Sequence, residues 1–215
     1  MRQINYQCKP SFTEEEKLVI QGYRYIAGVD EVGRGALAGP VVAAAVILPC
    51  HFKAPWLRQV KDSKLLTPDK REYLFDHIQE AAVSTGVGIV SHRIIDSYNI
   101  VWAIRLAMKR AIAQLSPPAD SLLIDFLSLS EVTIPQKGIV NGDGLSFSIA
   151  CASIIAKVTR DRLMIEMDDA YPGYKLGKHK GYCTGEHIAH LNRLGPSPIH
   201  RRSFHPIKEM LLRAI

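Results

Sequence analysis

The sequence predicts an α/β fold built on a mixed sheet of five strands with helices on its faces. Short apolar runs at about residues 25–29 and 41–48 indicate two opening strands. Further strands are expected near residues 87–92, 121–124 and 138–140, and helical segments alternate with the later ones. Opening strands followed by helix–strand alternation are typical of an α/β core with a mixed sheet.

The second run decides between two interpretations of the glycines that precede it. Gly33, Gly35 and Gly39 imitate a dinucleotide-binding fingerprint, in which a helix follows the glycines directly. Here the following run, at residues 41–48, is short, rich in alanine and β-branched residues, and bounded by prolines. Such a run is typical of a strand, so a dinucleotide site is disfavoured.

Helix-start and helix-stop residues separate the later strands. Thr67 suits an N-cap because Pro68 would occupy the first helical position, and Gly195 with prolines beyond it suits a helix end. The expected helices are a short one starting at residue 13, one starting at Thr67, one starting at Asp96 or Ser97 with a buried stripe to Ala111, one over residues 147–170, and one over residues 184–195. These helices would supply the layers that cover the sheet.

The length of 215 residues suits one domain with an appended segment. We expect a polar lead-in over residues 1–22, a core over residues 23–170 and a basic C-terminal helical segment over residues 171–215 packed on the core. No apolar run approaches the ~20 residues that a membrane helix needs, and the first residues lack a signal-peptide pattern. The scattered cysteines have no Cys-x-x-Cys spacing, so reduced thiols and a soluble, cytoplasmic protein are expected.

The basic charge of the chain is concentrated at its C-terminal end. Of 27 Lys/Arg and 21 Asp/Glu, residues 175–215 hold eight basic and two acidic ones, so 19 of each sign precede them. The whole net charge of +6 therefore lies in this segment, with tyrosine, phenylalanine and leucine between the charges. A folded basic surface of this kind fits a polyanion, because neutralised phosphates release counterions.

Residues 25–35, Tyr-Ile-Ala-Gly-Val-Asp-Glu-Val-Gly-Arg-Gly, carry the most information about function. Their apolar run ends in Asp30 and Glu31, and carboxylates at the end of a buried strand need a cation or hydrogen bonds to compensate them. The Gly-Arg-Gly turn that follows leaves backbone N–H groups open to an anionic ligand. An Asp-Glu pair alone is more often a solvated strand edge, but the combination indicates metal-assisted chemistry on a phosphodiester.

The Asp-Glu-Val-Gly-Arg-Gly segment resembles the signature of ribonuclease HII, the type 2 ribonucleases H. Other motifs of that family follow in the family's order: Asp62-Ser63-Lys64-Leu65, Ile95-Asp96, Asn99-Ile100, Leu123-Ile124-Asp125, Gly142-Asp143, residues 152–161, His179-Lys180-Gly181-Tyr182 and residues 200–204. The similarity covers about residues 25–208. It implies a ribonuclease H-like fold with helices appended at the C-terminus, the core being the catalytic part.

The resemblance also implies an activity. The protein would be an endoribonuclease that hydrolyses the RNA strand of RNA–DNA hybrids and nicks duplex DNA on the 5′ side of single embedded ribonucleotides. Its products would carry 5′-phosphate and 3′-hydroxyl ends, and its role would be ribonucleotide removal in DNA repair and replication. A monomer is expected, with no membrane contact, and the sequence indicates no protein partner.

Four acids match the family's catalytic and metal-binding positions: Asp30, Glu31, Asp125 and Asp143. Each follows an apolar stretch, so strand ends can bring the carboxylates to one edge of the sheet. Adjacent strand residues face opposite ways, so Asp30 and Glu31 converge only if their strand ends there. Hard oxygen ligands suit Mn²⁺ or Mg²⁺, and two ions ~4 Å apart would activate water and stabilise the leaving oxygen. Taken alone, Asp125 and Asp143 would be assigned to turns.

The resemblance assigns substrate discrimination to a turn and a tyrosine. The turn, which consists of Gly33, Arg34 and Gly35, would contact the phosphates and the 2′-hydroxyl that separates RNA from DNA. Tyr182 would pack on the sugar of the following deoxynucleotide, so that both features together read an RNA-to-DNA junction. Two departures from the family, Phe126 for a glycine and Asn141 for a lysine, bear on substrate fit near the second metal.

Three cations, Lys64, Lys157 and Arg160, are candidate phosphate contacts. Lys157 and Arg160 lie one helical turn apart, so pairing of either with Asp161 or Glu166 is an equal alternative.

Other functions stay open at this point. A ribonuclease HIII-like hybrid nuclease is the nearest, although that family typically has Gly-Lys-Gly in the turn and a long N-terminal domain. A non-catalytic nucleic-acid-binding protein would explain the basic segment but not four strand-end acids, which repel phosphate without a metal. A zinc site is a weaker alternative, formed by four side chains within twelve residues: His179, Cys183, His187 and His190.

Overall fold

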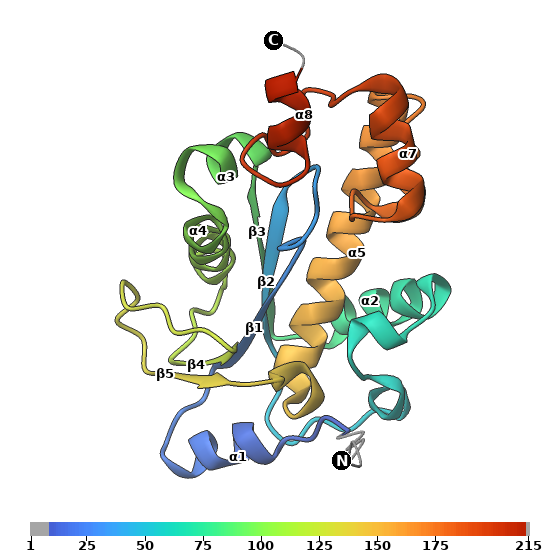
Figure 1. Ribbon diagram of the computed structural model, residues 1–215. Coiled ribbons are helices and arrows are strands. Elements are labelled where there is room, and N and C mark those ends of the chain that lie inside the picture. The colour runs from blue at the N-terminus through green and yellow to red at the C-terminus, as the bar shows by residue number, and fades with distance from the viewer. Residues whose placement is uncertain (1–8, 214–215) are drawn as a thin grey trace, which may run out of the picture.

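The computed structural model describes residues 9–213 (Figure 1). Its strands form one five-stranded sheet in the order β3-β2-β1-β4-β5. Their bounds are Ile26–Val32 for β1, Val41–Ile47 for β2, Ser84–Val90 for β3, Ser121–Asp125 for β4 and Gln136–Ile139 for β5. β2 pairs antiparallel with β1 and β3, whereas β4 pairs parallel with β1 and β5. The predicted mixed sheet is therefore confirmed.

Helices cover both faces of this sheet (Figure 1). Their bounds are Thr13–Ile20 for α1, Pro68–Ala81 for α2, His92–Tyr98 for α3, Ile100–Ile112 for α4, Phe147–Ala170 for α5, Leu176–His179 for α6, Gly185–Leu194 for α7 and Ile207–Arg213 for α8, with 3-10 turns at Pro55–Gln59 (η1), Ser63–Leu65 (η2) and Gly142–Gly144 (η3). α4 packs on one face through Ala103, Ala107 and Met108, and α2 and α5 pack on the other. Glycines allow close contact, because a Cβ at Gly28 would collide with the α5 backbone and one at Gly88 with α4.

The long helix begins and ends as the sequence predicts. α5 spans 24 residues, and the hydroxyl of Ser146 caps it by accepting a hydrogen bond from Ile149 N at 3.2 Å. The predicted cap of α2 is also confirmed, since Thr67 Oγ1 accepts from Lys70 N at 3.4 Å. None of the helices found within residues 9–213 combines the length and apolarity that crossing a membrane requires.

The helix predicted to start at Asp96 or Ser97 is wrong in its start and its continuity. α3 begins at His92, which was expected to end the third strand, and Asn99 separates it from α4 with a φ of +107°. Asn99 Oδ1 accepts a hydrogen bond from Trp102 N at 3.0 Å. Asparagine tolerates positive φ and caps the following helix well, so it starts a new helix instead of continuing the first.

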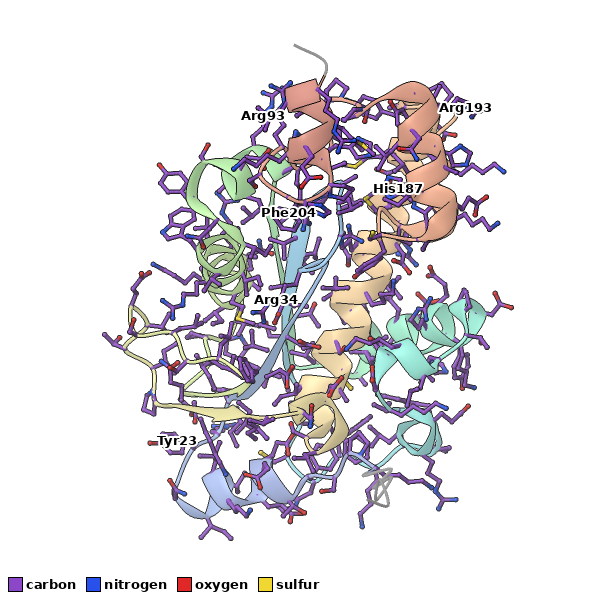
Figure 2. All side chains as sticks on the ribbon, viewed as in Figure 1. Tyr23, Arg34, Arg93, His187, Arg193 and Phe204 are labelled. Carbon is purple, nitrogen blue, oxygen red and sulfur yellow. The ribbon has the colours of Figure 1, made fainter. Side chains whose placement is uncertain are left out.

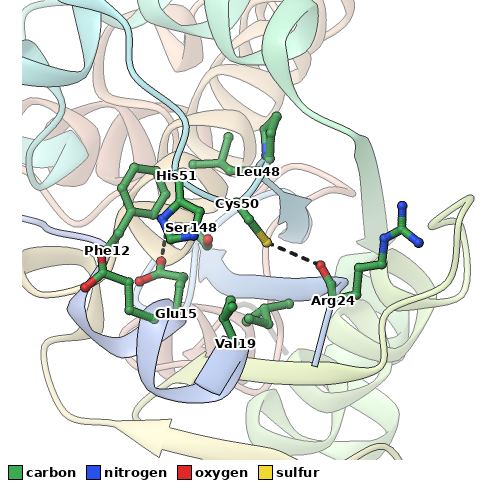
Figure 3. Close-up of a pocket in the computed structure, with 11 residues that line it drawn as sticks. Phe12, Glu15, Val19, Arg24, Leu48, Cys50, His51 and Ser148 are labelled. Atoms are coloured by element: carbon green, nitrogen blue, oxygen red, sulfur yellow. Dashed lines mark hydrogen bonds between the residues drawn. The ribbon is translucent and has the colours of Figure 1, made fainter. Parts of the chain in front are cut away.

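The N-terminal segment packs under the start of α5. Ser11 N donates to Leu145 O at 3.0 Å, and Glu15 Oε1 accepts from Ser146 Oγ at 2.7 Å and from Ser148 N at 2.9 Å. Figure 3 shows Glu15 and Ser148 lining a pocket of about 20 Å³, which has room for one water molecule but not for a substrate. The segment therefore supports the turn that leads into α5; the division of the chain at residues 22 and 170 stays a prediction.

Candidate active site

Strand ends bring the predicted acids together. Asp30 and Glu31 lie near the end of β1, and Asp125 is the last residue of β4, the parallel neighbour of β1. Asp143 lies in η3, where Gly142 N donates a hydrogen bond to Asp125 Oδ1 at 2.7 Å. The four carboxylates therefore lie at one edge of the sheet, at the start of α5.

The end of β1 differs from the expectation. The strand does not stop at the acids, because Glu31 and Val32 are still paired with β2. Its pairing with β4 does stop, at Val29 opposite Ile124. Beyond Val29, β1 no longer pairs with β4. Asp30 and Glu31 therefore lie beside the end of β4, the shorter of the two strands.

Burial and mutual repulsion raise the pKa of all four carboxyl groups. Burial is the largest cause for Asp30, which is 6% exposed, and the charges of the other three acids raise its pKa further. Burial also comes first in raising the pKa of Glu31, Asp125 and Asp143, and a neighbouring acid adds to each. Desolvated carboxylates that repel one another are stabilised by a bound cation, so this cluster favours cation binding.

The chemistry of these donors fits a hard divalent cation. All four are carboxylates, and oxygen ligands are those that Mg²⁺ and Mn²⁺ prefer. As the side chains stand, no three His, Cys, Asp or Glu side chains within residues 9–213 are arranged to hold a metal ion. A bound cation favours the charged carboxylates, so its binding would lower the raised pKa values of these acids.

Two further charged residues, Lys64 and Asp62, lie close to the four acids. Burial alone would lower the pKa of Lys64, but the charges of nearby acids, Asp62 first, raise it. Asp62 Oδ1 accepts from Lys64 N at 2.9 Å, and Ser63 Oγ lies 3.0 Å from Ser153 Oγ, which joins η2 to α5. The sequence motif that contains Asp62 was recognised, but the residue itself was not among the predicted site residues.

The Gly-Arg-Gly turn and Tyr182 lie side by side. Ala36 forms an isolated antiparallel bridge with Tyr182, and Leu37 N donates to Gly181 O at 2.8 Å. Gly33 has a φ of +96°, and a Cβ there would collide with the buried Arg160 side chain. The structure thus places Tyr182 next to the turn that carries Arg34, which Figure 2 labels.

Arg160 is in a different environment from the one predicted. Its side chain is fully buried, and the guanidinium donates to Pro40 O at 2.9 Å, Lys180 O at 2.9 Å and Ala38 O at 3.1 Å. This arrangement leaves no exposed surface for a phosphate, so Arg160 holds the backbone behind the turn instead. Lys157 forms the predicted alternative ion pair, with its Nζ 2.6 Å from an Asp161 carboxylate oxygen.

Arg201 is a second buried arginine, and the sequence interpretation gave it no role. Its guanidinium donates to Arg34 O at 3.0 Å, Gly39 O at 3.1 Å and Pro40 O at 3.2 Å. Carbonyl groups within residues 34–40 accept hydrogen bonds from Arg160 and Arg201 on the buried side of the loop. The two arginines therefore hold the loop backbone in position. The only signal in the sequence was its position in the recognised motif at residues 200–204.

The two departures from the family pattern share one backbone conformation. Phe126 has a φ of +59° and Asn141 a φ of +55°, both in the left-handed region that favours glycine or asparagine. A glycine would therefore adopt the backbone at Phe126 without strain. Phe126, the residue after Asp125, is 61% exposed and adds apolar surface to this edge of the site.

His187, one of the histidines considered for zinc, lies on α7 (labelled in Figure 2) and forms a hydrogen-bonded cluster with His200, which was not among them. His187 Nδ1 lies 2.9 Å from Tyr182 O, and its Nε2 lies 3.0 Å from His200 Nε2. His200 Nδ1 accepts from Ser197 N at 2.9 Å, which leaves its Nε2 to carry the proton that His187 accepts. Both neutral rings thus have hydrogen-bond partners at both nitrogens. Protonation of His187 at Nε2 would place two N–H donors, those of His187 and His200, facing each other.

This cluster predicts a loss of stability in acid. Burial lowers the pKa of both His187 and His200 to about 4, whereas an unfolded histidine titrates near 6.5. The unfolded chain therefore takes up protons first, so stability present above pH 6.5 is lost as the pH falls toward 4. We expect urea unfolding to show a smaller acid loss in His187→Gln than in the unchanged protein.

The matched control for this prediction is His205→Gln, which alters an exposed histidine paired with Glu209. Because the acidic site is the same in all three proteins, differences between their pH profiles report the histidines alone. Profiles for His187→Gln and the unchanged protein that run parallel from pH 7.5 to pH 5 would contradict the assignment.

The chain shares its sequence with a curated family along most of its length. The family model described as Ribonuclease HII matches residues 27–207. A ribonuclease HII from Dehalococcoides mccartyi is 57% identical over 201 residues, which cover 94% of this chain and 95% of that protein.

Solved structures agree with the fold. The ribonuclease H2 from Pyrococcus horikoshii OT3 superposes with a TM-score of 0.71 at 26% identity, over 87% of this chain and 97% of that one. A Bst-RNase HIII structure in complex with Mn²⁺ superposes with a TM-score of 0.66 at 19% identity, over 89% of this chain and 70% of that one. The second likeness concerns the fold alone, and together they confirm a ribonuclease H-like architecture.

Proposed function

The chain belongs to the ribonuclease HII family, and from this membership and the acidic site we propose that it nicks duplex DNA on the 5′ side of single embedded ribonucleotides. As a type 2 ribonuclease H, it is an endoribonuclease. We further propose that it cuts the RNA strand of RNA–DNA hybrids, acts as a monomer, and removes ribonucleotides during DNA repair and replication. The observation that carries the proposal is the edge where four carboxylates meet beside the Gly-Arg-Gly turn and Tyr182.

In the proposed mechanism, Asp30, Glu31, Asp125 and Asp143 would hold Mn²⁺ or Mg²⁺. A divalent ion supplies charge stabilisation at the phosphate and lowers the pKa of water. The carboxylates fix the position of that charge against the scissile phosphate, and Lys64 offsets part of their negative charge as the substrate approaches. Attack of a water oxygen on phosphorus would break the bond from phosphorus to the 3′ oxygen, and the 3′ oxygen would take up a proton, leaving a 5′-phosphate and a 3′-hydroxyl.

In the same proposal, the turn and Tyr182 distinguish the substrate. Backbone N–H groups of residues 33–35 face the 2′-hydroxyl and phosphates, since Arg160 and Arg201 hold carbonyl groups of the loop on the buried side. The centre of the Tyr182 ring lies 5.2 Å from the Arg160 guanidinium and 5.7 Å from Lys157 Nζ. These two cation–π contacts hold the ring in place. A ring held in this way suits contact with the sugar of the following deoxynucleotide.

Tyr182→Ala tests the junction assignment. We expect nicking at a single ribonucleotide in duplex DNA to fall about 10- to 100-fold, because loss of ring contact with a nucleotide costs ~1–3 kcal/mol. Cleavage of a uniform RNA–DNA hybrid should fall much less, since every position there lacks the junction. Steady-state rates on both substrates measure the ratio.

Tyr98→Ala is the control, because it removes an exposed tyrosine on α3 and should change neither rate. Equal losses on both substrates in Tyr182→Ala would contradict a junction role for Tyr182. Cleavage of hybrids without any nicking at single ribonucleotides, by the unchanged protein, would favour a ribonuclease HIII-like activity.

A further inference from the structure

An open groove of about 950 Å³ runs beside the acids, between the η1–α2 segment and the turn that leads into α5. Asp143, one of the four acids, lines it together with Asp62. Four basic residues line it as well: Lys9, Arg58, Lys61 and Lys70. None of the four basic residues belongs to the motifs that identified the catalytic site.

The cations of the groove are free to meet a ligand. Within residues 9–213, no ion pair involves Arg58, Lys61 or Lys70. Arg58 and Lys61 are exposed, and Lys70 Nζ lies 4.5 Å from the centre of the Tyr73 ring. By contrast, lysines on α1, α4 and β5 are paired with glutamates: Lys17 and Lys137 with Glu14, and Lys109 with Glu131.

The walls of the groove suit a sugar–phosphate backbone. Leu65 and Val140 are 59% and 64% exposed, and both line it. Apolar side chains between unpaired cations match the alternation of sugars and phosphates along a nucleic acid strand. The acids at the catalytic edge would repel this strand, and the basic residues offset that repulsion.

The position of the groove along α5 sets its relation to Tyr182. Asp143 lies in η3, four residues before the start of α5, whereas Arg160, in the second half of α5, lies 5.2 Å from the Tyr182 ring. At 1.5 Å per residue, the stretch of helix from residue 147 to residue 160 covers ~20 Å. The groove therefore lies near the start of this stretch, with Asp143 in its wall, and Tyr182 lies near the other end.

We propose that this groove binds the sugar–phosphate backbone of the duplex on the 5′ side of the cut, with Arg58, Lys61 and Lys70 contacting phosphates. The polarity rests on the proposed function, in which Tyr182 contacts the nucleotide on the 3′ side of the ribonucleotide. The groove thus extends the substrate contact beyond the junction, and it holds the strand segment that leaves with the 3′-hydroxyl.

The test uses a variant that combines Arg58→Ala, Lys61→Ala and Lys70→Ala. Substrates are DNA duplexes with one ribonucleotide and either a full or a shortened flank on its 5′ side. For the unchanged protein, shortening this flank should raise KM on the order of tenfold with kcat retained. The triple variant should have the raised KM on both substrates, because the groove no longer distinguishes them.

Salt dependence gives a second measurement that does not require cleavage. Binding of a fluorescent DNA duplex without ribonucleotide is followed as salt increases. Each lost phosphate contact should reduce the slope of log K against log salt by about 0.9, so the triple variant should lose about 2 to 3. The control combines Lys17→Ala, Lys109→Ala and Lys137→Ala, which removes the same charge from exposed positions elsewhere.

The outcomes separate this inference from the proposed function. Equal losses of slope in both triple variants, or a KM in the groove variant that still responds to the 5′ flank, would overturn the inference. A response only to shortening of the 3′ flank would overturn its polarity. If the unchanged protein cuts neither duplex but the groove variant alone loses salt-dependent binding, the proposed function fails and the groove assignment holds.

Discussion

Asp30→Asn is expected to reduce cleavage by on the order of 10³-fold or more, while the metal-free protein becomes more stable. Asparagine has nearly the same shape as aspartate, but it supplies no charge to a bound cation. A loss of ~4 kcal/mol of transition-state stabilisation corresponds to this decrease. Stability should rise because the buried Asp30 carboxylate is repelled by the other three acids, which together with burial raise its pKa.

The gain in stability has a defined dependence on pH. The pKa of Asp30 is higher in the folded protein than in the unfolded chain, so its charged form destabilises the fold at neutral pH. The cost disappears as the pH falls through the folded-state pKa, and the advantage of Asp30→Asn should shrink with it. Thermal unfolding in a chelator at pH 8 and pH 5 measures the difference, and single-turnover assays with Mg²⁺ or Mn²⁺ measure cleavage.

Asp76→Asn is the control, since it neutralises an exposed aspartate on α2 and should affect neither property. An Asp30→Asn protein that keeps activity within tenfold of the unchanged protein would contradict the assignment of Asp30 to catalysis. A lower unfolding temperature in the chelator would contradict the repulsion among the acids.

Arg201→Ala is expected to destabilise the fold by about 3 kcal/mol or more. The substitution leaves the carbonyl groups of Arg34 and Gly39 without the guanidinium, and each unsatisfied buried acceptor costs about 1–3 kcal/mol. Burial and the charge of Arg160 lower the pKa of Arg201 to about 9. This repulsion between the two arginines reduces the net loss but does not replace the hydrogen bonds.

The same change should also weaken recognition of the ribonucleotide. Arg201 holds the carbonyl of Arg34 within the Gly-Arg-Gly turn, so its loss should raise KM for a single-ribonucleotide duplex in the fraction that stays folded. Arg201→Lys should restore only part of the stability, because an ammonium cannot reproduce the fork of three carbonyl contacts. Urea unfolding and steady-state kinetics measure the two effects.

Arg202→Ala provides a matched control one residue away. Its side chain is exposed, and the contact it makes with Asp96 uses the backbone N–H. We expect Arg202→Ala to unfold within 0.5 kcal/mol of the unchanged protein, the usual range for surface substitutions (~±0.5 kcal/mol). Equal stabilities for Arg201→Ala and Arg202→Ala would contradict the role assigned to Arg201.

Features fixed by local sequence could be predicted well. The apolar runs before Asp30 and Asp125 gave the two neighbouring strands, and the cap at Thr67 gave the start of α2. The resemblance then supplied Asp143, which local rules would have assigned to a turn. Because strand ends and motifs are short-range features, the edge where the acids meet could be anticipated.

Features that depend on contacts between segments far apart in the sequence could not be predicted. Arg160 was a candidate phosphate contact or ion-pair partner, but it is buried because segments near residues 38–40 and 180 surround it in the fold. Arg201 is separated by more than 160 residues from the carbonyls that it holds. The break at Asn99 was also missed, since helical periodicity continues across it and only the side-chain cap shows it.

The most direct test of the proposed activity maps the cut in an end-labelled DNA duplex that contains one ribonucleotide. The protein is incubated with the duplex and Mg²⁺ or Mn²⁺, and the products are resolved to single nucleotides. One nick is expected on the 5′ side of the ribonucleotide, with 3′-hydroxyl and 5′-phosphate ends, and it should be absent with Asp30→Asn. No nick with either metal, or a cut on the 3′ side of the ribonucleotide, would contradict it.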